Sequence, residues 1–175
     1  LILQLGLLHL KNSQRTVSGI EFNPDARISK FIESLPFKLT NAQIRVINEI
    51  HEDMTSKRQM NRLIQGDVGS GKTIVAVIAM LLAVFNGYQA VFMVPTEILA
   101  EQHFNGITPL VRDFGVKTSL LTGSVSKKKK EQIKEGIKNG EYDLIIGTHA
   151  LLEEDVVFSK LGLVVTDEQH RFGVK

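Results

Sequence analysis

Apolar residues follow two patterns along this chain, one with the period of a helix and one with the short runs of buried strands. After residue 61 the runs are short and rich in Val, Ile and Leu, and helical stretches separate them. We predict strands at 62–65, 90–94, 118–121, 144–146 and 163–166, and helices near 72–86, 97–114 and 127–139. Helices between apolar strands are typical of crossover connections, so an α/β fold with a mainly parallel sheet flanked by helices is expected.

The first part of the chain has a helical pattern instead. Residues 1–11 predict a leucine-rich helix, which is followed by the polar stretch KNSQRTVSG. An Asn-Pro-Asp sequence predicts the start of a second helix at about 26–34, and Pro36 predicts its end. A third helix is expected after an N-cap at Thr40 or Asn41. Its apolar face holds Ile44, Ile47 and Ile50.

Composition narrows the class of protein but does not identify it. The 175 residues are 43% hydrophobic and 23% charged, which is enough for one domain with a core. The lack of cysteine argues against disulfides and thiolate metal sites and is compatible with a cytoplasmic protein. A net charge of +2 is too small to indicate nucleic acid binding by itself. The longest apolar run, 74–85, is shorter than the roughly 20 residues that span a bilayer, so no membrane association is expected.

The stretch QGDVGSGKTIVA has the spacing of a phosphate-binding loop and lies between a predicted strand and a helix. Its glycines allow successive backbone N–H groups to point at phosphate oxygens, and the helix start adds a positive dipole end. Lys72 can reach the β and γ phosphates of ATP, and Thr73 offers a hydroxyl to Mg²⁺. Asp67 would repel nucleotide unless it points outward. The residues predicted to bind nucleotide in this loop are Gly66, Gly69, Ser70, Gly71, Lys72 and Thr73.

The stretch LVVTDEQH places two adjacent acids directly after a predicted strand. Ligands of open α/β sheets bind at the carboxyl ends of the strands, so Asp167 is positioned to hold Mg²⁺. Glu168 is the expected general base for the water that attacks the γ phosphate. An Asp-Glu pair after a strand is also common in plain polar loops. Together with the phosphate loop, however, the pair predicts nucleotide hydrolysis.

This acid box, with Gln169 and His170, resembles the DExH boxes of superfamily 2 helicases. The stretches VPTEILAEQH, LTGSV and IGTHALL resemble the nucleic-acid motifs of that superfamily, and each follows a predicted strand. The resemblance implies a RecA-like P-loop NTPase domain in which His170 joins the catalytic set. It also implies that the three stretches contact a sugar-phosphate backbone at one sheet edge. The residues carried over are Thr96, Glu97, Thr122, Gly123, Thr148 and His149.

Upstream of the phosphate loop, FKLTNAQ resembles the adenine-reading segment of such enzymes. The resemblance implies that the Phe37 ring stacks on the base. Gln43 would present its amide, which is both donor and acceptor, to the adenine edge. The alternative is that Gln43 is an exposed residue of an amphipathic helix.

Within the superfamily, GDVGSGKT, PTEILAEQH, GTHALL and DEQHRFGV most resemble the RecG family. That resemblance implies an ATP-dependent DNA helicase that remodels stalled forks and Holliday junctions in recombination and repair. The alternative is the family of transcription-repair coupling factors, where we would expect an aromatic residue at 70, a threonine at 97 and a glutamate at 169. Ser70, Glu97 and Gln169 favour the RecG family.

The resemblance also implies a domain organisation. Residues 37–175 would form the first RecA-like lobe, truncated at its C-terminal side, and residues 1–36 would be linker helices after an N-terminal wedge domain. The first residue is not methionine, and the coupling motif and the second-lobe arginines would lie beyond Lys175. We therefore expect a fragment that binds nucleotide weakly and hydrolyses it negligibly, with branched DNA, the second lobe and the wedge as partners of the full-length chain.

Other classes of protein fit the sequence less well. A P-loop kinase or GTPase would need a phosphoacceptor pocket or a guanine-reading segment, and we identify neither. A nonenzymatic interaction domain could keep the loop for structure alone. The lysine run 127–130 is typical of a solvated helix face, although phosphate contact is an alternative. The histidines lack the spacing of a zinc site.

Overall fold

The computed structural model describes residues 19–67 and 69–167, so the predicted helix at 1–11 lies outside the described residues. The chain divides into two compact units. One unit holds the residues up to Pro24 together with Leu39–Val75, and the other holds Asp25–Lys38 and the chain from Ala76. The predicted boundary between linker and lobe near residue 36 stays a prediction.

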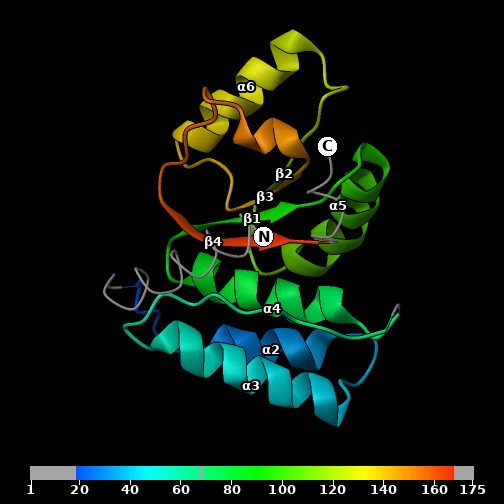
Figure 1. The fold of residues 1–175 in the computed structure, drawn as a ribbon, viewed down its shortest axis with the longest axis vertical. Coiled ribbons are helices and arrows are strands. Elements are labelled where there is room, and N and C mark those ends of the chain that lie inside the picture. Colours follow the sequence, from blue (N-terminus) through cyan, green and yellow to red (C-terminus); the bar gives the residue numbers. More distant parts are fainter. Residues whose placement is uncertain (1–18, 68, 168–175) are drawn as a thin grey trace, which may run out of the picture. The chain divides into compact units, whose positions relative to one another are not determined.

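The second unit is built on a parallel four-stranded sheet in the order β2-β3-β1-β4 (Figure 1). The strands are β1 (Gln89–Met93), β2 (Thr118–Leu121), β3 (Leu144–Gly147) and β4 (Leu161–Thr166). The helices are α2 (Ala26–Ser34), α5 (Glu97–Arg112), α6 (Lys127–Lys138) and the 3₁₀ turn η2 (His149–Leu152). Helix α4 (Lys72–Phe85) starts in the first unit and ends in the second. The predicted parallel α/β fold is confirmed.

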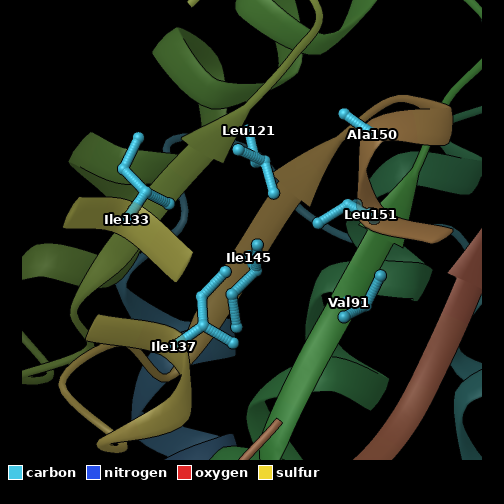
Figure 2. Close-up of a cluster of buried hydrophobic side chains, with 7 residues drawn as sticks. All are labelled: Val91, Leu121, Ile133, Ile137, Ile145, Ala150 and Leu151. Atoms are coloured by element: carbon cyan, nitrogen blue, oxygen red, sulfur yellow. The ribbon is translucent and has the colours of Figure 1, made fainter. Parts of the chain in front are cut away.

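One face of the sheet is closed by α6 and η2. Figure 2 shows Ile133 and Ile137 of α6 on the left, facing the strand residues Leu121, Ile145 and Val91, with Ala150 and Leu151 of η2 on the right. The opposite face meets α5, where the Phe92 ring lies 4.9 Å from the imidazole of His103. Successive strand residues point to opposite faces, so Val91 packs toward α6 and η2 while Phe92 packs toward α5. Most residues of β1, β2 and β3 are therefore buried, as apolar strands predict, whereas β4 is half-buried to exposed, with Val164 51% exposed.

Helix α2 packs on the ends of α4 and α5 within the same unit. The Phe31 ring meets the Phe114 ring edge to face at 5.5 Å, and the Arg27 guanidinium lies 4.1 Å from the Phe85 ring centre. Asp25 caps α2 by accepting the N–H of Arg27 at 2.8 Å. The predicted helix start and end are both confirmed.

The buried side chain of Gln89 joins three segments at the start of β1. Its amide nitrogen donates to the carbonyls of Ile137 and Tyr142, both at 2.9 Å. Its amide oxygen accepts the N–H groups of Ser159 at 2.8 Å and Lys160 at 3.2 Å. A buried amide is tolerated only when it is paired in this way, and here it fixes the connections before β3 and β4.

The first unit holds α3 (Asn41–Thr55), which begins with a capping box on Thr40. Ile47 and Ile50 are buried as predicted, whereas Ile44 is 43% exposed. The predicted strand at 62–65 is wrong, because the structure forms no strand there. Leu63 is 70% exposed, and the Arg62 guanidinium is held by Glu49 at 2.6 Å and Asp53 at 2.7 Å on α3. Side-chain pairing, rather than a sheet, anchors this segment. None of the helices within the described ranges is long and apolar enough to cross a membrane.

Candidate functional site

The four strands end together at one edge of the sheet. The register pairs Leu121 with Gly147, Gly147 with Met93, and Met93 with Thr166. One step further, Val94 N donates to Gly147 O at 2.9 Å and Asp167 N donates to Met93 O at 2.9 Å. The segments after all four strands therefore begin side by side. This confirms the prediction that the three helicase-like stretches begin at one edge of the sheet, and Asp167 lies at the same edge.

The segment after β1 turns directly into α5. Thr96 is the N-cap, and its hydroxyl accepts the N–H of Leu99 at 3.3 Å. Glu97, in the first turn, accepts the N–H of Ser124 at 2.8 Å. Thr96 is exposed and Glu97 is half-buried. Thr96 thus has a structural role in capping, and its exposed position keeps it accessible to a ligand.

Four residues after β2 and β3 were predicted to contact nucleic acid, and two of them are buried while two are exposed. Thr122 and Thr148 are buried, with 1% and 8% exposure. The Thr122 hydroxyl lies 3.1 Å from that of Ser124. Gly123 and His149 are exposed. Thr122 and Thr148 therefore offer little surface to an external strand, and the role of the whole set stays a prediction.

Asp167 follows β4 and is half-buried. Its Oδ2 lies 3.5 Å from Nε2 of His103 on α5, and the His103 ring packs on Phe92. Sequence reasoning quoted His103 within PTEILAEQH but gave it no role. The only signal was a histidine two turns into a helix that starts at the same sheet edge. Glu168, Gln169 and His170 lie outside the described residues.

The phosphate loop is described by itself in the first unit. Gly69 and Gly71 have φ values of 82° and 76°, which only glycine adopts readily. The Lys72 ammonium donates to the carbonyls of Gly66 at 2.7 Å and Asp67 at 2.8 Å. The side chain of Asp67 is exposed. The ammonium group lies within the loop that the sequence assigns to phosphate.

Both the oxygen and the nitrogen of the Gln43 side-chain amide form hydrogen bonds. Its Oε1 accepts the N–H of Thr40 at 2.8 Å, which completes the capping box. Its Nε2 donates to the carbonyl of Ser70 at 3.0 Å and lies against Gly71, where a Cβ would collide with it. Gln43 therefore ties α3 to the phosphate loop, a contact the sequence did not predict. Its adenine-reading role, like that of the 49% exposed Phe37, stays a prediction.

The two residues predicted to bind Mg²⁺ carry the kind of ligand atom that this ion prefers. Mg²⁺ takes oxygen ligands and is commonly bound by one or two protein groups, with waters and substrate phosphates completing the shell. Thr73 of the first unit has a hydroxyl and Asp167 of the second unit has a carboxylate. That the two residues hold one Mg²⁺ stays a prediction. The described part of the chain has no group of three or more histidine, cysteine, aspartate or glutamate residues that could hold a metal. A magnesium site of the nucleotide-dependent kind does not require one.

Several known proteins are similar to this chain over nearly all of its residues. Proteins named ATP-dependent DNA helicase RecG from Thermotoga maritima and Bacillus subtilis are 50% and 49% identical over 99% and 100% of this chain. The chain spans 22% and 26% of those two relatives. A structure of RecG bound to a three-way DNA junction aligns at 48% identity with a TM-score of 0.88, covering 99% of this chain and 24% of that one.

A more distant structure supports the fold alone. A hypothetical ATP-dependent RNA helicase from Sulfolobus tokodaii aligns over 85% of this chain and 43% of its own, at 21% identity with a TM-score of 0.63. The family model described as DEAD/DEAH box helicase matches residues 40–175, which include the phosphate loop, the shared strand edge and the acid box. The chain belongs to the DEAD/DEAH box helicase family.

Proposed function

We propose that this chain is the ATP-binding lobe of a RecG-type helicase that remodels branched DNA. The observation that carries the proposal is the 48% identity and close structural match to RecG bound to a three-way DNA junction. Ser70, Glu97 and Gln169 favour this family over the transcription-repair coupling factors. A second RecA-like lobe and a DNA-wedging domain in the full-length protein would be the partners of this lobe.

The proposed chemistry divides among the chain's own residues. Lys72 and the loop N–H groups hold the phosphates of ATP, and Asp167 and Thr73 hold Mg²⁺. Bound Mg²⁺ would neutralise charge that develops on the phosphate oxygens. Glu168 removes a proton from the attacking water. The residues after β1, β2 and β3 contact the sugar-phosphate backbone, which positions DNA without reading its sequence.

Two measurements on the full-length protein test this proposal. The first is Mg²⁺-dependent binding of a fluorescent ATP analogue. We expect Lys72→Ala to weaken it by at least about tenfold, because a charge-assisted phosphate contact is lost. Lys57→Ala is the matched control, since Lys57 is an exposed lysine of the same unit. Equal affinity in wild type and Lys72→Ala would reject the nucleotide site.

The second measurement compares substrates. We expect forked DNA to stimulate ATP hydrolysis more than linear duplex, and RNA to stimulate it least. Hydrolysis driven by RNA, with no remodelling of forks, would reject the RecG-type assignment and leave the nucleotide site intact.

A further inference from the structure

The carboxylate of Glu97 links two segments that lie on different strands. It belongs to the first turn of α5, after β1, and it accepts the N–H of Ser124, after β2, at 2.8 Å. In the sheet β3 lies between β1 and β2, so these two strands are about 10 Å apart at the usual spacing. The Glu97 side chain therefore reaches past the end of β3 and holds the segment that follows β2.

Gly123, the neighbour of Ser124, makes room for this contact. A Cβ built on Gly123 would lie 2.7 Å from Oε1 of Glu97, closer than atoms of these types approach. Gly123 is not among the glycines with positive φ, so its backbone conformation is open to other residues. A methyl group at this position would therefore have to displace the carboxylate that passes beside it.

The charge of Glu97 argues for a role inside the protein. A carboxylate that faced a DNA phosphate would repel it, and the repulsion would weaken binding at this edge. A carboxylate that accepts a backbone N–H makes a strong, charge-assisted hydrogen bond. Its place in the first turn of α5 is also favourable, because the positive end of the helix dipole lies there.

We propose that Glu97 is a positioning residue that braces the turn at 122–124 against the start of α5, and that it makes no contact with DNA phosphate. This differs from the sequence-based expectation, which placed Glu97 among the residues that contact the DNA backbone. The brace fixes the spacing between two of the segments that the proposed function assigns to the DNA backbone, so this inference rests on that function. Exposed Thr96 and Gly123 then present their groups to the strand at a fixed separation.

Hydrogen exchange tests the brace without DNA or ATP. In the full-length protein, we expect the peptide containing Ser124 to exchange at least about tenfold faster in Glu97→Ala, because its N–H loses a charged acceptor. Glu97→Gln keeps an amide oxygen at the same place and should restore most of the protection. Exchange that is equal in wild type and Glu97→Ala would overturn the proposal.

DNA-stimulated ATP hydrolysis tests the consequence. We expect the DNA concentration for half-maximal stimulation to rise about tenfold in Glu97→Ala and to stay within about twofold of wild type in Glu97→Gln. In both variants the hydrolysis rate at saturating DNA should change less than this DNA concentration does. Tighter DNA binding in both variants would overturn the proposal, because it would mean that the native carboxylate faces phosphate.

A double substitution isolates the contact between Glu97 and Gly123. Gly123→Ala alone should mimic Glu97→Ala, because the added methyl group displaces the carboxylate. In the Glu97→Ala background the same change should add little, because the space is then empty. Additive losses would contradict the brace. If wild type itself fails to respond to DNA, the proposed function fails, and the exchange experiment still decides the brace.

Discussion

At the scale of single residues, one glycine at the carboxyl edge of the sheet lies where there is no room for a side chain. Lack of space, rather than an unusual backbone conformation, therefore explains the glycine at this position. Gly147 ends β3 beside β2, and a Cβ there would run into the carbonyl oxygen of Leu121 and approach the side chain of Leu151 to 3.0 Å. Neither neighbour can yield easily, because Leu121 is part of the sheet and Leu151 is buried in the core cluster. The helicase-like stretch IGTHALL therefore depends on glycine for close packing.

Gly147→Ala should lower the local free energy of unfolding of β2 and β3 by about 2 kcal/mol, the usual cost of overpacking a close contact. Native-state hydrogen exchange of the strand amides measures this quantity. Gly106→Ala in α5 is the matched control, because a Cβ there meets nothing within 4 Å. It should stabilise its helix by about 0.5–1 kcal/mol. Effects of the same sign at both positions would contradict this account.

At the scale of elements, Lys134 joins α6 to the segment that follows η2. Its ammonium lies 2.6 Å from Glu153 and 2.6 Å from Asp155, and its side chain is 13% exposed. The hydrogen bond from Lys134 lowers the pKa of Asp155, and the bonds to Asp155 and then Glu153 raise the pKa of Lys134. These ion pairs hold the C-terminal end of η2 against α6.

These shifts predict a pH window for the cluster. Asp155 has its pKa lowered by folding, so its contribution is present above its unfolded value and is lost as pH falls through the folded value. Lys134 has its pKa raised, so its contribution is present below its unfolded value and is lost as pH rises through the folded value. Between about pH 4 and pH 10, Lys134→Met should therefore loosen the peptide 149–156 in hydrogen exchange.

The difference between Lys134→Met and wild type should shrink as pH falls below that window. Lys138→Met, on an exposed lysine in the last turn of α6, is the control and should leave the peptide unchanged. A difference that stays constant down to the acid limit would show that packing by the lysine stem, rather than the charged cluster, stabilises η2.

Local signals predicted most of the elements, and tertiary contacts explain what they missed. The start of α3 was predictable because Thr40 and Gln43 form a capping box within four residues. The strand expected at 62–65 does not form, because its apolar pattern is short and Arg62 is drawn to two acids on α3. The contact of Glu97 with Ser124 spans 27 residues and depends on strand order, which periodicity does not reveal.

At the scale of the whole molecule, α5 connects two features of the proposed motor that the sequence treats as separate motifs. Its first turn carries Glu97, which holds the turn after β2. Two turns later His103 lies 3.5 Å from Asp167, the acid after β4, and its ring packs at a tilt against Phe92 of β1. The helix therefore has one contact toward the proposed DNA segments and another toward the acid proposed to hold Mg²⁺.

The two contacts that α5 makes, one through Glu97 and one through His103, should be separable by substitution. His103→Ala removes the imidazole that lies 3.5 Å from the Asp167 carboxylate. Outer partners of metal-binding carboxylates typically account for 10- to 100-fold in affinity or activity. We expect about a tenfold rise in the Mg²⁺ concentration needed for binding of a fluorescent ATP analogue, with the half-maximal DNA concentration within about twofold of wild type. Glu101→Gln, on an exposed residue of the same helix, should change neither quantity.

Glu97→Ala should show the opposite pattern, with a raised DNA requirement and a nearly normal Mg²⁺ requirement. If His103→Ala instead raised both requirements equally, α5 would act as one packed unit whose ends cannot be perturbed independently. Loss of the DNA response alone would mean that His103 serves the strand edge and not the acid. Separate effects are expected because the two contacts lie six residues apart on the helix and involve different segments, the turn after β2 and the acid after β4.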